Sequence, residues 1–171
     1  NKTVIPESVT SIGASAFDGC TNIKNITIPE SVTSIGDFAF GGCINIEVIE
    51  IPESVISIGH AAFAYCINLK SVKISQNITS IEGETFSGCE NLETITMPEN
   101  VTKIGAYAFV NCSSLKSIII PKNLTSIENG TFSGCENLKS ITIPKSVTSI
   151  GGYAFDGCNN LTTINYTGTQ E

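Results

Sequence analysis

The seven cysteines of this 171-residue chain recur at a constant interval of 23 residues. They stand at Cys20, Cys43, Cys66, Cys89, Cys112, Cys135 and Cys158. A fixed period along a whole chain is typical of a solenoid, in which each repeat packs only against its two neighbours. The sequence therefore predicts one solenoid of about seven repeats over residues 1–171, with an extended surface in place of a central pocket.

Eight positions of the repeat stay apolar or small in every copy, and these positions predict the core. In one repeat they are Ile23, Ile26, Ile28, Val32, Ile35, Ala39, Phe40 and Cys43. A single 23-residue unit cannot enclose eight inward side chains. We therefore expect each side chain to stack on its own copy in the next coil.

Local patterns predict the path of one coil. Ile26-Thr27-Ile28 alternates with the period of a short strand, which ends at Pro29 because proline has no amide donor. Residues 32–35 are rich in β-formers, and residues 39–43 are too few for an α-helix and predict a tight turn or 3₁₀ segment. The expected fold class is a solenoid with short parallel strands on one face and short β or 3₁₀ segments and turns elsewhere.

The spacing of Ile23, Ile26 and Ile28 matches the strand signature of a leucine-rich repeat. With the motif I-P-x-S-V-T-S-I-G-x-x-A-F-x-G-C, the chain resembles the BspA-type (Treponema pallidum-like) leucine-rich repeat family over almost its whole length. That resemblance implies a curved solenoid with its parallel sheet on the concave face. It also implies surface proteins of bacteria and of mucosal protozoa such as trichomonads, which are often adhesive.

The charge of the chain argues against one class of partner. The net charge is −7, and all nine basic residues are lysine. Arginine is the usual bidentate ligand of phosphate, so we expect no nucleic-acid partner. No apolar run is long enough to cross a bilayer and no signal peptide is visible. Because the chain begins at Asn1 in the middle of a repeat, we expect it to be a piece of a longer protein.

The cysteines leave two alternatives open. Neighbouring copies would lie within disulfide reach. However, their odd number and apolar surroundings favour a structural ladder of buried, reduced thiols. Zinc sites use cysteines two to four residues apart together with histidine, so neither a metal nor another cofactor is expected.

The candidate catalytic residues of the sequence do not form a recognisable catalytic pattern. The only histidine, His60, stands at a variable outward position, with Asp37 at the equivalent position one coil earlier. Glu50 and Glu53 are close in sequence, but paired carboxylates need a pocket that shifts a pKa before they act as acid and base. We expect a protein that is not an enzyme.

Two groups of outward residues are candidates for contact with a partner. The first forms a charged strip that changes from acidic to basic along the chain: Glu30, Glu50, Glu53, Lys73, Glu99, Lys122 and Lys145. The second is an apolar cluster expected at one edge, comprising Ile44, Tyr65 and Ile67. A charge gradient orients a partner and an exposed apolar cluster can bind one, whereas ordinary surface charge is the alternative.

Two other rows predict structural roles. The recurring glycines at Gly13, Gly36, Gly59, Gly105 and Gly151 predict a backbone angle that other residues avoid. The recurring asparagines, such as Asn45 and Asn91, predict inward amides that satisfy turn N–H groups.

The leading hypothesis is a non-catalytic binding or adhesion module of a cell-surface or secreted protein. Its partner would be a protein or glycan of a host or neighbouring cell, and no part of the segment would insert into a membrane. The alternative is a structural spacer or scaffold that self-associates through the ends of the solenoid, since terminal strands can pair with another copy.

Overall fold

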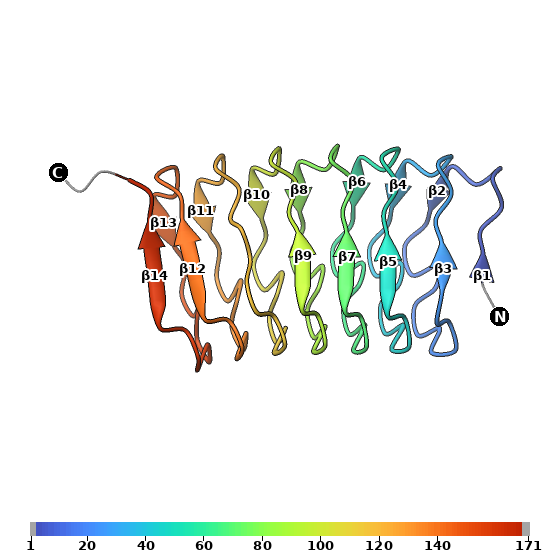
Figure 1. Ribbon diagram of the computed structural model, residues 1–171. Helices are drawn as coiled ribbons and strands as arrows, with labels where there is room; N and C mark the ends of the chain where they lie inside the picture. Colours follow the sequence, from blue (N-terminus) through green and yellow to red (C-terminus); the bar gives the residue numbers. More distant parts are fainter. Residues whose placement is uncertain (1–2, 169–171) are drawn as a thin grey trace.

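The computed structural model describes residues 3–168, and in them the chain winds into a β-solenoid with fourteen short strands and no helix. Figure 1 shows the strands in two rows, one in front of the other, along the axis of the solenoid. The predicted fold class is therefore confirmed. The two ends of the chain, on which the expectation of a longer protein rested, lie outside the described residues.

The front row contains one strand from almost every coil. Its members are β1 (Thr3–Val4), β3 (Ile26–Thr27), β5 (Val48–Glu50), β7 (Ser71–Lys73), β9 (Thr94–Thr96), β12 (Ser140–Ile143) and β14 (Thr163–Tyr166). All pairing is parallel and joins residues 23 positions apart, for example Ile49 with Val72 and Val72 with Ile95. Between β9 and β12 the row continues as an isolated bridge from Ile119 to Thr142. We call the outer side of this row the strand-bearing face.

The back row repeats a two-residue Ser-Ile or Lys-Ile strand. Its members are β2 (Ser11–Ile12), β4 (Ser34–Ile35), β6 (Ser57–Ile58), β8 (Ser80–Ile81), β10 (Lys103–Ile104), β11 (Ser126–Ile127) and β13 (Ser149–Ile150). Their pairing is also parallel, as in Ile12 with Ile35 and Ile35 with Ile58. Except at the last coil, the isoleucines of this row are buried.

The third side of each coil is a tight turn, as the sequence predicts, and it too bonds to its neighbour. The Phe17 amide donates to the Ala39 carbonyl at 2.8 Å, and the Phe63 amide donates to the Thr85 carbonyl at 2.9 Å. Hydrogen bonds between coils therefore run along all three sides. Because backbone polar groups need partners when buried, this arrangement fixes the register of every coil on the next.

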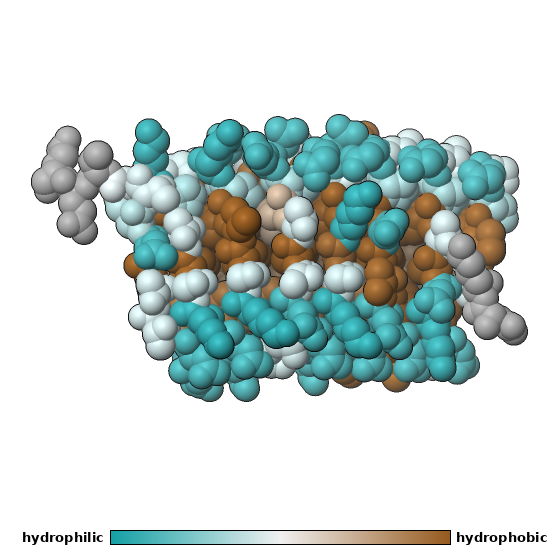
Figure 2. Space-filling view, viewed as in Figure 1, coloured by the Kyte–Doolittle hydropathy of each residue, from teal (hydrophilic) through white to brown (hydrophobic). Residues whose placement is uncertain are grey.

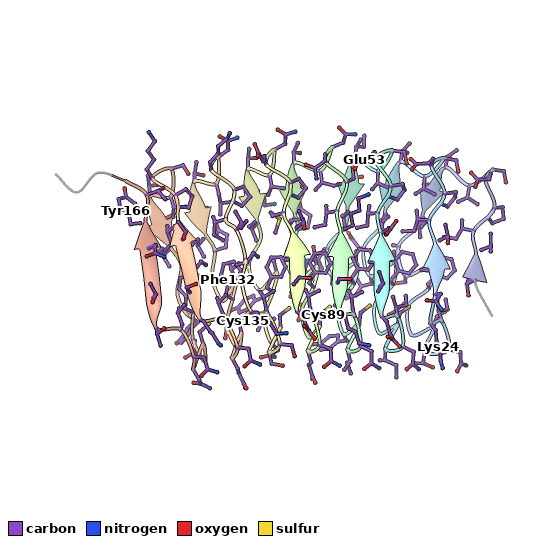
Figure 3. All side chains as sticks on the ribbon, viewed as in Figure 1. Lys24, Glu53, Cys89, Phe132, Cys135 and Tyr166 are labelled. Carbon is purple, nitrogen blue, oxygen red and sulfur yellow. The ribbon has the colours of Figure 1, made fainter. Side chains whose placement is uncertain are left out.

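The core consists of ladders of identical side chains. Neighbouring phenylalanine rings stack nearly parallel, with centroids 5.4 Å apart for Phe40 and Phe63 and 5.5 Å apart for Phe86 and Phe109. The five inner rings are completely buried, and Phe132 is labelled among them in Figure 3. Offset stacking of this kind adds to the free energy of area burial.

The cysteines form a second ladder next to the phenylalanines. All seven are free thiols; the five inner ones are buried and Cys20 and Cys158 are half-buried. Each thiol from Cys43 onward donates to the phenylalanine carbonyl of the preceding coil, as from Cys66 Sγ to Phe40 O at 3.2 Å. Burial raises the pKa of Cys43 to about 11 and that of Cys89 to about 12. The side chain at this position is therefore a small apolar group with one weak donor.

The expectation for the recurring glycines is wrong. None of Gly13, Gly36, Gly59, Gly105 and Gly151 has a positive φ. Except at Gly13, where nothing lies within 4 Å of a Cβ, they are required by close approach to the preceding coil, since a Cβ on Gly36 would lie 2.6 Å from the backbone nitrogen of Ala14. The left-handed conformation occurs instead in the turns, at two other rows: one includes Gly42 and Gly88, and the other includes Phe38 and Tyr107.

The expectation for the asparagines needs a similar correction. Their side chains are half-buried or exposed, and those of Asn45, Asn91 and Asn160 donate to the preceding coil, as from Asn45 Nδ2 to Thr21 O at 2.7 Å. Asn91 Nδ2 donates to the Asn68 side chain at 3.2 Å. These side-chain amides therefore link neighbouring coils from outside the core, because they donate to carbonyl groups at the surface.

We predict that Phe86→Ala lowers the free energy of unfolding by about 3–5 kcal/mol, because it empties a ring-sized space in the middle of the ladder. Urea denaturation followed by circular dichroism measures the change. The matched control is Phe155→Ala at the half-buried end of the ladder, where a smaller loss is expected. A loss below about 1 kcal/mol for Phe86→Ala would contradict the stacked core.

The buried thiols predict a dependence of stability on pH. The pKa of Cys89 is about 12 in the folded chain against an ordinary 9.0. Its contribution is complete below pH 9.0 and is lost as the pH rises towards 12, because the unfolded thiol ionises first. Between pH 8 and 10, the free energy of unfolding of the unchanged chain should therefore fall by about 1.4 kcal/mol more than that of Cys89→Ala. Parallel stability curves for the two proteins would contradict this prediction.

Candidate interaction surface

The strand-bearing face is lined by the strand side chains that point away from the core. In β5, β7 and β9 the paired outward residues are Glu50, Lys73 and Thr96. In the rest of the row this position holds Val4, Thr27, Ile119, Thr142 and Asn165. Figure 2 shows an apolar band along this face, with hydrophilic side chains above and below it. Ile119 is the most exposed large apolar residue of the described chain, at 83%.

The remaining members of the predicted charged strip lie in the turns after the front strands. We call this the turn row: Glu7, Glu30, Glu53, Gln76, Glu99, Lys122 and Lys145. Its side chains are exposed, and Figure 3 labels Glu53 at the upper edge. The turn row changes from acidic to basic along the axis. The predicted strip is therefore divided between the strands, with Glu50 and Lys73, and the rim above them.

A groove of about 520 Å³ lies at the acidic end, between the turn row and the strands. Its floor and walls include Ile26, Ile51 and the half-exposed Val48, with Pro29 and Pro52 at the turns. Four carboxylates and one lysine border it: Glu7, Glu30, Glu50, Glu53 and Lys73. We call it the carboxylate groove. It combines an apolar surface with negative charge and is open to solvent.

The opposite edge of the strand-bearing face carries a row of alternating charges. This edge row comprises Lys24, Glu47, Lys70, Glu93, Lys116 and Lys139, and Figure 3 labels Lys24 at the lower edge. Lys70 Nζ lies 2.7 Å from Glu47 Oε2, and Lys116 Nζ lies 2.5 Å from Glu93 Oε2. The hydrogen bond from Lys70 lowers the pKa of Glu47, and that from Lys116 lowers the pKa of Glu93. Most of the charged side chains of the edge row are therefore paired with one another.

The carboxylate groove differs in this respect from four glutamates that pair with a lysine of the next coil, two of which are Glu47 and Glu93. Glu82 pairs with Lys103 at 2.8 Å, and Glu99 with Lys122 at 3.5 Å. Within residues 3–168, no described lysine pairs with any of the four groove carboxylates. Glu53 accepts a hydrogen bond from the backbone amide of Gln76 at 2.7 Å. The groove, which Lys73 also lines, is thus a region of net negative charge whose carboxylates form no ion pair with a described lysine.

The apolar candidates lie on a different side, at the turns behind the strands. Tyr65 is 59% exposed and adopts a positive φ of 58°, where six of the seven coils have glycine or asparagine. Its ring covers Gly88 of the next coil, so that a Cβ there would lie 2.7 Å from Tyr65 Cδ1. Tyr107 covers Gly130 in the same way. These tyrosines each pack over a glycine of the following coil.

This packing direction concerns the predicted apolar cluster of Ile44, Tyr65 and Ile67, which stays a prediction. The Tyr65 ring leans towards the coil of Gly88, whereas Ile44 belongs to the coil on its other side. Ile44 and Ile67 are half-buried, and the amide of Asn68 donates to the Ile44 carbonyl at 3.2 Å. We therefore infer that these three residues contribute to packing between the turns of neighbouring coils. The carboxylate groove is then the leading candidate surface.

Other chemistry finds little support in the geometry. The Asp37 carboxylate accepts the backbone amide of His60 at 2.8 Å, and His60 Nε2 lies 3.9 Å from Glu84 in a half-exposed position. In the part of the chain that the structure describes, no group of three or more His, Cys, Asp or Glu side chains could hold a metal ion. The same residues contain no helix long and apolar enough to cross a membrane.

Comparison with known families identifies the class of protein. The family described as BspA type Leucine rich repeat region matches in six copies, over residues 1–116 and 102–171. The chain therefore belongs to the BspA-type leucine-rich repeat family, as its motifs predict. No curated protein sequence matches it.

Solved structures show the same architecture. A leucine-rich repeat protein of T. pallidum is 32% identical with a TM-score of 0.90, over 94% of this chain and 78% of that one. One from Eubacterium ventriosum is 31% identical with a TM-score of 0.83, over 99% of this chain and 44% of its own. A leucine rich cell surface protein of Faecalibacterium prausnitzii is 28% identical with a TM-score of 0.59, over 99% and 60%. The chain spans about half of the latter two proteins.

The contact between Tyr65 and Gly88 predicts an energetic coupling. Gly88→Ala should destabilise the chain by about 2 kcal/mol, because the new methyl group meets the ring and the φ of +68° is unfavourable. In a Tyr65→Gly background only the unfavourable φ remains, so the cost should fall by about 1 kcal/mol in a double-mutant cycle. Gly19→Ala is the control, since its φ is +66° but nothing lies within 4 Å of its Cβ. Additive effects of the two changes would contradict the contact.

Proposed function

We propose that this chain is a non-catalytic protein-binding module of a cell-surface or secreted protein, and that it binds its partner through the strand-bearing face. The observation that supports the proposal most strongly is the carboxylate groove. Glu47, Glu93 and Glu99 each find a lysine in the next coil, whereas the groove combines four carboxylates that form no ion pair, and a single lysine, with apolar side chains. Such a surface favours a partner with complementary charge and an apolar side chain.

Two further observations favour binding over chemistry. The invariant positions are used by the core, and the variable positions, which include those of the strand-bearing face and its rims, point outward, as in repeat proteins that bind through an extended surface. The similarity to a protein described as a leucine rich cell surface protein supports display outside the cell. Adhesion to a protein or glycan of a host or neighbouring cell is the form of binding that we propose.

The test is adhesion of beads coated with the chain to candidate host cells and purified surface proteins. One variant carries Glu30→Lys, Glu50→Lys and Glu53→Lys. Its control carries Glu90→Lys, Glu136→Lys and Asp156→Lys, which change the net charge equally at exposed sites outside the groove. We expect the groove variant to lose at least about tenfold in apparent affinity and the control to stay near the unchanged chain, because a buried or partly buried charge pair strongly affects binding.

The alternative role as a spacer gives a different result. A spacer depends on length and stiffness, so neither set of charge changes would alter adhesion, whereas removal of two whole repeats would. Circular dichroism of both variants must show the unchanged fold, because exposed substitutions of this kind alter stability by only about 0.5 kcal/mol each.

A further inference from the structure

The strand-bearing face has charges that complement its own reversed copy. The turn row is acidic from Glu7 to Glu53 and basic at Lys122 and Lys145. The front row has eight strand positions, from β1 to β14, with the Ile119 bridge as the sixth. If a second copy is turned by a two-fold axis parallel to the strands and placed between β7 and β9, position two meets position seven and position three meets position six. Two-fold interfaces of this self-complementary kind are the commonest in homo-oligomers.

In this arrangement the turn row pairs opposite charges. Glu30 follows the second strand and Lys145 the seventh, so they face each other across the two copies. Glu53 follows the third strand and faces Lys122, which follows the sixth position. Gln76 meets Glu99, a neutral contact. Each pair occurs twice in the dimer because of the symmetry.

The same two-fold axis also brings opposite charges together along the edge row. Glu47 meets Lys116 and Lys70 meets Glu93, which are again pairs of opposite charge. The one pair of like charge is Lys24 with Lys139, near the ends of the face. A shift of the axis by half a coil to β7 would instead place Glu53 against Glu99 and Glu47 against Glu93. The complementarity therefore selects the axis between β7 and β9.

The same register brings the exposed apolar side chains onto facing strands. Ile119, at the sixth position, faces the third strand of the second copy, where Glu50 holds the equivalent position and Val48 and Pro52 line the carboxylate groove beside it. Ile119 is 83% exposed and Val48 48%, so both have apolar surface to bury. Burial of such surface favours association. The isoleucine of each copy would enter the groove of the other.

We propose that two copies of this chain associate through their strand-bearing faces as an antiparallel two-fold dimer, with Ile119 in the partner groove and Glu53 paired with Lys122. This inference rests on the proposed function, because it names a partner for the same surface. The face is about 35 Å long at 4.8 Å per coil and about 23 Å wide including both rims, on the order of 800 Å² per copy. That area is near the standard size of a specific interface.

The first experiment measures self-association of the full chain by sedimentation equilibrium over a range of concentrations. We expect a dimer, and we expect Glu53→Lys and Lys122→Glu each to raise its dissociation constant at least about tenfold. A mixture of these two variants should form a heterodimer, because one Glu53–Lys122 pair is then reversed and the other retained. Within one chain the two residues are three coils apart, about 14 Å at strand spacing, so they cannot form this pair internally.

Two matched variants test the apolar contact. Ile119→Thr installs the residue found at the same position in β3 and β9, and it should weaken the dimer at least about fivefold. Glu50→Thr removes the carboxylate that shares the third strand with Val48, and it should tighten the dimer. Glu136→Lys, on a turn outside the face, is the control and should have no effect.

The outcomes separate this inference from the proposed function. A chain that stays monomeric up to about 500 µM overturns the dimer, as does a dimer that is insensitive to Ile119→Thr and to the charge reversals. In that case the bead assay still decides whether the face binds a foreign partner. A foreign cationic partner would lose affinity on Glu50→Thr, whereas the dimer gains it.

Discussion

The structure depends on the parallel hydrogen bonding of each coil to the next at a constant offset of 23 residues. Every position meets its own copy in the next coil, so a core side chain must pack against the equivalent side chain of its neighbours. Phenylalanine rings satisfy this by offset stacking, and the cysteines by donating to a carbonyl of the preceding coil. A glycine is required where the backbones of neighbouring coils approach too closely for a Cβ. The repeat of the sequence is therefore a direct consequence of backbone geometry.

The same constraint shapes the surface. A residue that is changed on the outside also stands in a row, and its neighbours above and below decide its effect. In the edge row, alternation of lysine and glutamate allows pairs such as Glu47–Lys70 to form between coils. In the turn row, runs of like charge prevent such pairing at the acidic end. Charge that is not neutralised along the row is available to another molecule, which is why the carboxylate groove carries the proposals on function.

Sequence reasoning succeeded where one position has one role in every coil. The core positions, the two strands of each coil and the tight turn all followed from periodicity and from the limits on proline and helix length. It failed where the reason for a residue lies in the adjacent coil. The row that includes Gly36 suggested a special backbone angle, but the cause is the approach of Ala14, and the asparagine amides bond outside the core.

By itself the sequence determined the repeat, the family and the composition of the core, because a 23-residue period admits only one stacking of equivalent residues. Only the tertiary structure decided which outward residues act together. Neighbours along a row are 23 residues apart, and whether their side chains pair, cover each other or leave a groove depends on where each coil carries them. Thus the Tyr65 ring covers Gly88 of the next coil, and Glu50 and Glu53 were brought to one groove by the turn between strand and rim.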